Sequence, residues 1–260
     1  MTAIILTPRS ALSKTLTIAV IDTGVDATAI THLCKYGHRS YIGNHPTHDP
    51  HGHGTHIASL IEKYAGVGDY CIVSLQYYSE VNSGQQNLRN LKDAMQFAIN
   101  IKVDFINVSG GGPEYNEEEQ RLIKNALDKG IKVVVAAGNE HHNLSTYCDY
   151  YPACYKDSRM VVVGNRVSEE TWQSGVYYML RKLITRANRS DDESLKRASD
   201  SNWGDVITRW EIGDKVEGRV PCHLRHLNPD PKERCAAKMS GTSQATAIAT
   251  GKLVHERLTK

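Results

Sequence analysis

The segment "IKVVVAAGN", residues 131–139, decides the fold class because residues 133–137 are all apolar. A strand with one solvated face alternates apolar and polar residues, whereas a strand that helices cover on both faces is apolar almost throughout. The segment "LTIAVI", residues 16–21, is also mostly apolar. Both segments therefore predict central strands of a sheet that has helices on both faces.

Strands and helices alternate along the rest of the chain. Similar apolar runs predict further strands at 71–78, 103–109 and 159–165. Apolar residues at helical spacing predict helices at 53–65, 88–99, 115–129 and 243–257. This alternation predicts an α/β fold, a single domain over residues 1–260 with a doubly wound, mostly parallel sheet flanked by helices. Residues 165–200 are the least regular and are expected to form a surface insertion, with a helix near 172–187.

The composition argues against some classes of partner. The 260 residues carry a formal net charge of +2, so neither a nucleic acid nor a membrane surface is indicated as a partner. No segment approaches the roughly 20 consecutive apolar residues that a membrane-spanning helix needs. The N-terminus lacks the pattern of a secretory signal, which predicts a cytoplasmic protein. Oligomeric state is not indicated.

The chain has six cysteines, and in the cytoplasm we expect them to be reduced thiols. In an oxidising compartment, Cys148 with Cys154, and Cys222 with Cys235, could instead close short loops. The segment "CHLRHLNPDPKERC", residues 222–235, also offers Cys222, His226 and Cys235 as zinc ligands. A surface loop without metal is the alternative.

The segment "HDPHGHGTHIAS", residues 48–59, holds four histidines, which have three interpretations. The first is zinc binding, because His51, His53 and His56 resemble the H-x-H-x-D-H cluster of metallo-β-lactamase-type hydrolases. Thr55 stands where that cluster has its Asp, and further ligands would have to come from elsewhere in the chain. The second is that they are solvated loop histidines, which suits those before position 53.

The third interpretation makes His53 a general base, which requires an acid to orient it and a nucleophile to deprotonate. Asp22 ends an apolar strand in "IAVIDTGVD", and Ser243 lies in "MSGTSQATAIATG", where a small-residue loop enters a helix. Backbone N–H groups at a helix start can stabilise an oxyanion, and the Asn139 amide could do the same. Because strand ends share one edge of a parallel sheet, these residues predict one site.

These motifs resemble those of the subtilisin-like serine proteases, the subtilases. "AVIDTGVD" resembles the family's Asp motif, "HGHGTHIAS" its His motif, "AAGNE" its oxyanion motif and "GTSQA" its Ser motif. The resemblance implies a catalytic triad of Asp22, His53 and Ser243, with Asn139 and the Ser243 N–H in the oxyanion hole. His56 would be a packing residue. The implied activity is a serine endopeptidase that cleaves protein or peptide substrates through an acyl-enzyme, with no metal and no cofactor.

Weaker matches suggest where a substrate would lie. Ser83 and Gly84 of "NSGQ" resemble a segment whose backbone pairs with an extended substrate. Ser109, Gly110 and Gly111 of "INVSGGG" resemble the opposite edge and one wall of the pocket for the residue before the cut. A substrate held between two such edges is bound mainly through main-chain hydrogen bonds.

Two carboxylates lie near the segments that line this pocket in the family. Glu140 and Asp149 together would favour a Lys or Arg in the substrate by direct charge pairing. The alternative is that both are solvated loop charges. A strong preference for basic substrates is therefore one of two expectations for this chain.

The chain also departs from the family pattern. Gln244 stands where Met usually follows the nucleophile, and Ala247 stands where the family has Pro. The loop after the His helix lacks the usual calcium-binding insertion, and we expect no propeptide before the motifs. These departures suggest a divergent intracellular member. A peptide ligase or cyclase that uses the same acyl-enzyme, and a peptide-binding pseudoenzyme, remain as alternatives.

Overall fold

The computed structural model describes residues 14–168, 196–224, 226–227 and 235–260. Within these residues, seven parallel strands form one sheet in the order β2-β3-β1-β4-β5-β6-β7. The strands are β1 (Leu16–Asp22), β2 (Arg39–Ser40), β3 (Tyr70–Gln76), β4 (Phe105–Val108), β5 (Lys132–Ala136), β6 (Val161–Arg166) and β7 (Arg209–Ile212). The α/β fold with a parallel sheet is therefore confirmed.

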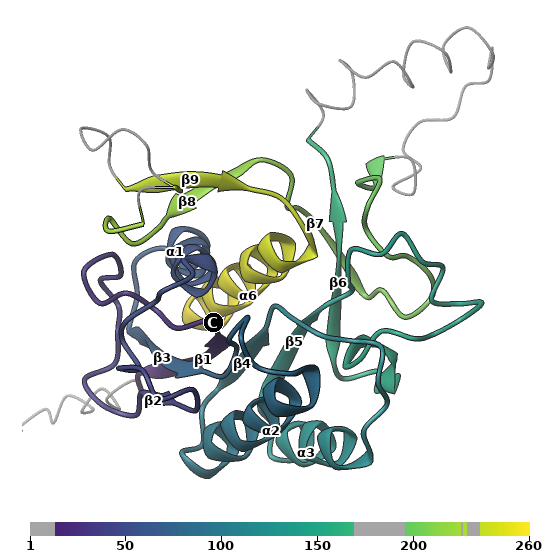
Figure 1. Ribbon diagram of the computed structural model, residues 1–260, viewed down its shortest axis with the longest axis horizontal. Coiled ribbons are helices and arrows are strands. Elements are labelled where there is room, and N and C mark those ends of the chain that lie inside the picture. The colour runs from purple at the N-terminus through teal and green to yellow at the C-terminus, as the bar shows by residue number, and fades with distance from the viewer. Residues whose placement is uncertain (1–13, 169–195, 225, 228–234) are drawn as a thin grey trace, which may run out of the picture.

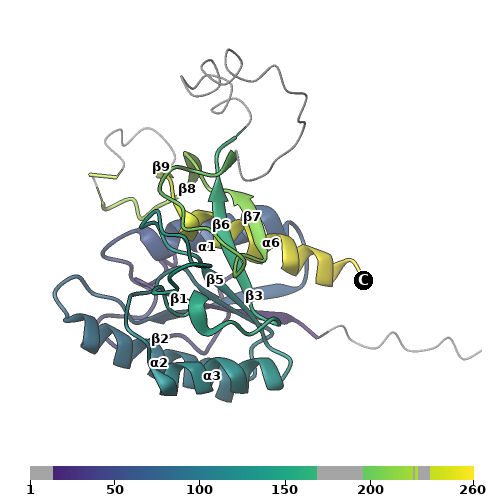
Figure 2. The same cartoon turned by 90° about the vertical axis from the view of Figure 1, so that its right-hand side faces the viewer.

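Helices cover both faces of this sheet. The α-helices are α1 (His53–Ala65), α2 (Gly84–Asn100), α3 (Glu117–Asp128) and α6 (Thr242–Leu258), and Ala153–Tyr155 form a short 3-10 helix. Figure 1 and, from the side, Figure 2 show α1 and α6 on one face and α2 and α3 on the other. None of the helices in the described part of the chain is long and apolar enough to span a bilayer.

Strand β1 shows why the central strands are apolar on both sides. Ala19 and Ile21 pack into the cluster formed with α2 and α3, whereas Ile18 and Val20 pack into the cluster formed with α1 and α6. All four side chains are buried. Burying an Ile or Val side chain contributes about 1.5–3 kcal/mol, so successive residues stabilise opposite layers.

The strand order reverses next to β1, because β3 lies on one side of it and β4 to β7 lie on the other. In doubly wound sheets, ligands bind outside the carboxyl ends of the strands at such a reversal. Strand β5 ends at Ala136, earlier than predicted, because Gly138 has a φ of 97° that an extended strand does not allow. The chain therefore turns just before Asn139.

A second, two-stranded sheet was not predicted. Its strands β8 (Val216–Arg219) and β9 (Ala236–Met239) are antiparallel and lie against α1 (Figure 1). His56 of α1 is fully buried, and its Nε2 lies 3.1 Å from the carbonyl oxygens of Val216 and Ala237. These two short strands have few apolar residues and so give no strand pattern in the sequence. Their contacts with His56 come from a helix that is distant along the chain.

All six cysteines lie within the described residues, and all are paired, so the expectation of reduced thiols is wrong for this structure. The disulfides are Cys34–Cys71, Cys148–Cys154 and Cys222–Cys235. The first joins residues 37 positions apart whose Cα atoms lie 4.8 Å from each other. Only the folded sheet brings these two segments together. Most of the predicted insertion, including its helix near 172–187, lies outside the described residues.

Candidate active site

The acidic and basic candidates meet at the carboxyl end of β1. Asp22 is the last residue of β1 and is buried, and His53 is the first residue of α1. His53 Nδ1 lies 2.7 Å from Asp22 Oδ1, and the Thr23 N–H donates to the same oxygen at 2.8 Å. Because Nδ1 donates to the carboxylate, Nε2 is the ring nitrogen that can accept a proton.

The start of α1 approaches β1 so closely that only glycine fits after the histidine. A Cβ on Gly54 would lie 2.1 Å from the Gly24 carbonyl oxygen and 3.1 Å from Asp22 Cβ. Gly24 itself has a φ of 111°, which favours glycine. The two glycines of "DTG" and "HGT" therefore allow the carboxylate and the imidazole to meet.

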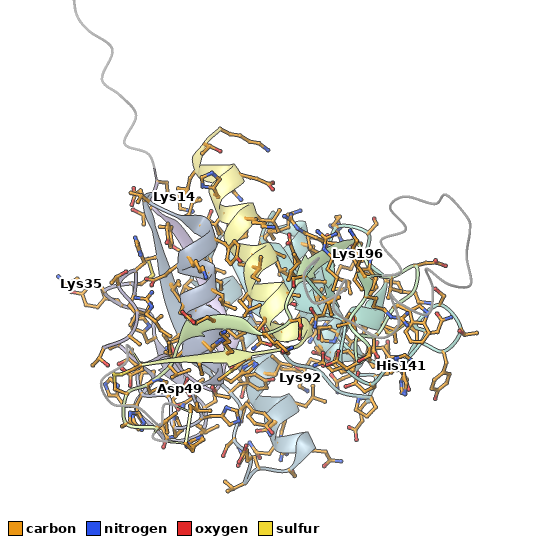
Figure 3. All side chains as sticks on the ribbon, turned by 90° about the horizontal axis from the view of Figure 1, so that it is seen from above. Lys14, Lys35, Asp49, Lys92, His141 and Lys196 are labelled. Carbon is orange, nitrogen blue, oxygen red and sulfur yellow. A yellow bond between two sulfur atoms is a disulfide. The ribbon has the colours of Figure 1, made fainter. Side chains whose placement is uncertain are left out.

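A fully buried carboxylate, Asp49, organises the loop before α1, a role that was not predicted from the sequence. Its Oδ1 accepts from Thr23 Oγ1 and from the N–H groups of His51 and Gly52, at 2.8–3.1 Å. Its Oδ2 accepts from Thr55 N at 2.9 Å and from Thr55 Oγ1 at 2.7 Å. Figure 3 shows Asp49 on the opposite side of α6 from His141. Five donors satisfy this charge and hold the N-terminus of α1 in place.

The charges around His53 favour its protonated form. Burial alone lowers the pKa of His53, but the charge of Asp22 and its hydrogen bond, together with the more distant charge of Asp49, raise it by more. The net effect places the pKa of His53 above that of an ordinary histidine. By contrast, burial lowers the pKa of His56 to about 4, so His56 stays neutral in its contacts with β8 and β9.

The second half of the site lies at the start of α6. Gly241, with a φ of 147°, precedes the helix, and Ser243 is the second residue of α6. The Thr242 N–H donates to Asn139 Oδ1 at 2.9 Å. Because a backbone N–H requires an oxygen acceptor, this contact assigns the Asn139 amide and leaves Nδ2 available as a donor. The Ser243 N–H has no acceptor within the helix, because it belongs to the first turn.

The Ser243 hydroxyl is hydrogen-bonded to the end of β4 and not to His53. Ser243 Oγ donates to the Ser109 carbonyl oxygen at 2.7 Å, and Ser109 Oγ in turn lies 3.3 Å from the Ser243 carbonyl oxygen. Asn107 Nδ2 donates to Ser109 Oγ at 2.8 Å. The structure therefore brings Asp22 and His53 into contact, but the Ser243 hydroxyl is hydrogen-bonded to the Ser109 carbonyl oxygen.

The two predicted substrate edges line one cavity. Gly84 and Gly111 both lie in the wall of a cavity of about 250 Å³, together with Tyr78, Leu88 and Tyr151. Other lining residues come from α2, α3 and the segment that follows β4. Gly84 of the segment 82–85 and Gly111 of the segment 109–111 therefore border the same space.

The remaining residues of these edges have structural contacts. Ser83 is the N-cap of α2, and its hydroxyl accepts from Gln86 N at 3.2 Å. A Cβ on Gly110 would lie 2.6 Å from the Tyr77 hydroxyl, so the backbone there is closely packed. Ser83 can therefore serve a ligand through its backbone, while its side chain caps the helix.

Tyr150, which was not predicted as a site residue, lies beside the glycines where the pocket for the residue before the cut was expected. A Cβ on Gly111 would lie 2.7 Å from the Tyr150 ring, and a Cβ on Gly138 would lie 2.8 Å from it. Glu140 Oε2 accepts from Asn202 Nδ2 at 2.6 Å. The aromatic ring thus occupies the space between the two glycine segments, and Glu140 has a protein partner beside it.

Asp149 also has a partner, because its Oδ1 lies 3.2 Å from His142 Nδ1. Its side chain is one-fifth exposed. Neither this carboxylate nor the one at position 140 is therefore without a neighbour. The sequence alone could not show these contacts because each joins two different loop segments.

The two metal interpretations from the sequence do not fit the geometry. His53 is paired with Asp22, His56 Nε2 lies on backbone carbonyl oxygens, and His51 Nε2 lies 3.1 Å from a carboxylate oxygen of Glu80. One ring nitrogen of each histidine is thus directed to a different partner, and the potential ligand atoms of the three do not gather into one group. The zinc interpretation of 222–235 is also wrong, because both of its cysteines are joined to each other in a disulfide.

Residues 13–256 match the subtilase family, Peptidase_S8, so the chain belongs to the subtilases. Subtilisin from Bacillus pumilus is 31% identical over 159 residues, which cover 58% of this chain and 58% of that protein. The major intracellular serine protease of Bacillus subtilis (strain 168) is 30% identical over 166 residues, covering 58% and 51%. The chain thus matches about half the length of these curated relatives.

A solved structure extends the likeness over nearly the whole fold. The crystal structure of a lanthipeptide protease has a TM-score of 0.70 with this chain at 22% sequence identity. The match covers 94% of this chain and 75% of that one. At this identity the match describes the arrangement of strands and helices and nothing beyond it.

Proposed function

We propose that this chain is a serine endopeptidase with Ser243 as its nucleophile, His53 as its general base and Asp22 as the residue that orients the base. The observation that carries the proposal is the 2.7 Å contact between His53 Nδ1 and buried Asp22 at the strand-order reversal. Membership of the subtilase family supports the same assignment. We also treat the chain as one catalytic domain.

The proposed reaction begins when a substrate strand lies between the segments at 82–85 and 109–111. An N–H group of that strand can donate to the Ser109 carbonyl oxygen, which now holds the Ser243 hydroxyl. The displaced hydroxyl then turns about its Cα–Cβ bond toward Nε2 of His53. The imidazole takes the hydroxyl proton while Oγ attacks the scissile carbonyl carbon.

The negative charge that forms on the carbonyl oxygen needs two donors. Asn139 Nδ2 is free to donate because its Oδ1 already accepts from Thr242 N. The Ser243 N–H at the start of α6 is the second donor. The imidazolium then protonates the leaving amine, and water releases the acyl group from Ser243 with His53 again as the base.

The test is labelling of the full chain with a fluorophosphonate probe, followed by peptide mass mapping. We expect one label on Ser243, no label in Ser243→Ala, and a loss of labelling in His53→Ala. The labelling rate should rise with pH through a midpoint above 6.5, the usual histidine value, because the pKa of His53 is raised. Folded protein that does not label at any pH would contradict the proposal.

One observation favours a second candidate, a peptide-binding protein without catalysis. The Ser243 hydroxyl donates to the Ser109 carbonyl oxygen. A site in which this hydrogen bond persisted would be inactive, because the hydroxyl could not reach His53. Absence of probe labelling, combined with saturable binding of extended peptides, would support this candidate. A ligase would require that the acyl group be transferred to an amine, and no contact among the described residues favours that route.

We propose a small residue before the cleaved bond in preference to Lys or Arg. The ring of Tyr150 takes up space between Gly111 and Gly138, and Glu140 is held by Asn202. A peptide library that varies this residue tests the proposal. Preferred cleavage after Gly, Ala or Ser is expected, and strong preference for Lys or Arg would restore the charge-pairing hypothesis.

The three disulfides bear on the compartment in which the protein works. Cytoplasmic reductants keep most thiols reduced, so a fully paired set of cysteines favours an oxidising compartment over the cytoplasm expected from the sequence. One relative is nevertheless named an intracellular protease. Alkylation of the protein from its native source, before and after reduction, distinguishes the two. Six cysteines modified without reductant would favour the cytoplasm.

A further inference from the structure

Three side chains from separate segments meet on the surface near the start of α1. Asp26 follows β1, His48 lies in the loop before α1 next to Asp49, and His223 follows Cys222. One potential ligand atom from each of the three lies within 4.8 Å of the others. The imidazole rings of His48 and His223 are stacked, with centroids 5.1 Å apart and planes 19° apart.

The carboxylate of this group is buried and only half satisfied. Asp26 is 8% exposed, and its Oδ1 accepts from Thr28 N at 2.8 Å and from Thr28 Oγ1 at 2.6 Å. Its Oδ2 lies 3.7 Å from His223 Nδ1, and no other described residue lies within hydrogen-bond distance of it. The Asp26 side chain is 11% exposed. Its charge is therefore largely removed from solvent, and a cation at Oδ2 would compensate it.

We propose that Asp26, His48 and His223 bind one Zn²⁺ ion. Two imidazoles and a carboxylate are the ligand types that zinc prefers, and water can complete a tetrahedral set. Zinc–ligand bonds of about 2.1 Å place tetrahedral ligand atoms about 3.4 Å apart, so small side-chain rotations from the observed spacing suffice. The two Thr28 contacts orient Asp26 as outer hydrogen bonds orient metal ligands elsewhere.

The ion would join three parts of the fold that no disulfide joins to one another. His223 belongs to the segment closed by the Cys222–Cys235 disulfide, and that segment lies against the loop before α1. A Cβ on Gly52 would meet Leu227 at 2.5 Å and Leu224 at 3.0 Å. Zinc would therefore stabilise the packing of this segment next to the candidate active site, whether or not the site is catalytic.

The test is calorimetric titration of the metal-free full chain with Zn²⁺, in the Ser243→Ala background to prevent self-cleavage. We expect one ion per chain, and binding at least 30-fold weaker in His48→Ala and in His223→Ala. His45→Ala is the matched control, because His45 lies in the same loop outside the group, and it should bind zinc normally. A visible spectrum with Co²⁺ should show tetrahedral coordination that both test variants lose.

A second measurement separates this site from the candidate active site, which also contains a histidine and a carboxylate. His53→Ala in the same background should keep the full zinc affinity, and Zn²⁺ should raise the melting temperature of that variant. The double variant His48→Ala/His223→Ala should show no such rise. No binding by the parent chain, undiminished binding by the double variant, or loss of binding only in His53→Ala would each overturn the proposal.

Discussion

The two halves of the candidate site are prepared to different degrees. On one side, Asp22 holds His53 at 2.7 Å, and Asp49 holds the loop before α1 with five hydrogen bonds. On the other side, the Ser243 hydroxyl is bonded to the Ser109 carbonyl oxygen. The proposed acid–base half is therefore built by contacts within the folded chain, whereas the proposed nucleophile is hydrogen-bonded away from its proposed base.

Under the proposed assignment, this difference defines what a substrate would do. Buried carboxylates have to be satisfied by the protein itself, because leaving them unpaired is costly. A partly exposed hydroxyl can exchange one acceptor for another at little cost. A peptide that takes over the Ser109 carbonyl oxygen would release the hydroxyl, so the last contact of the triad would form only with substrate bound. Hydrogen bonds in unliganded sites are often incomplete in this way.

The largest expected effect tests the prepared half. Asp22→Asn keeps the shape of the side chain but removes the charge that holds His53 Nδ1–H. We expect kcat/KM to fall by ~10⁴-fold, because the imidazole then adopts the wrong tautomer and its cation is not stabilised. Steady-state peptide hydrolysis measures this, with circular dichroism to show an unchanged fold. A loss below tenfold would mean that the contact is only structural.

The next largest effect tests the other half. Asn139→Asp keeps an oxygen acceptor for Thr242 N but replaces the Nδ2 donor. We expect kcat to fall by ~10²–10³-fold with little change in KM, as for the loss of one oxyanion donor. Asn139→Ala should lose as much activity and also some stability. If the Asp variant stayed active, the oxyanion would have to be held elsewhere.

A third prediction concerns the stability of the acid–base half at low pH. The pKa of buried His56 is lowered to about 4, so the unfolded chain takes up a proton at a higher pH than the folded chain does. This group therefore destabilises the fold as the pH falls from about 6.5 to 4, and has little effect above 6.5. Between pH 7 and pH 5 its contribution is a loss of about 2 kcal/mol.

Urea unfolding at these two pH values measures the effect in the Ser243→Ala background. A His56→Gln variant in the same background is the comparison, because all other titrating groups are shared. Its stability should fall by about 2 kcal/mol less than that of the parent between pH 7 and pH 5. Equal falls in the two proteins would show that His56 is protonated in both states or in neither.

The smallest expected effect concerns the pocket beside the nucleophile. Tyr150→Ala removes the ring that lies between Gly111 and Gly138. We expect kcat/KM for substrates with a large apolar residue before the cut to rise about tenfold relative to those with Ala, since pocket fit contributes 1–3 kcal/mol. Unchanged ratios would place the substrate residue elsewhere. Tyr147→Ala, an exposed tyrosine in the preceding loop, is the control.

Much of this molecule could be predicted because its signals are local. Apolar runs predict the central strands. Asp22, Ser109 and Asn139 lie at or just after the ends of those strands, as their positions in the sequence predicted. The short strands β2, β8 and β9 carry too few apolar residues for such a signal. Asp49 was missed for a different reason. An aspartate in a histidine-rich loop is expected to be a surface charge, and only the folded structure shows the five donors that allow it to be buried.

By itself, the sequence determined the fold class, the family and the order of the candidate catalytic residues, because each depends on a short contiguous motif. Only the tertiary structure decided which partners these residues have. The Ser243 contact with Ser109, the position of the Tyr150 ring, the Cys34–Cys71 disulfide and the group of Asp26, His48 and His223 each join segments far apart in the chain. Such contacts depend on distances of a few ångströms, which no pattern along the chain encodes.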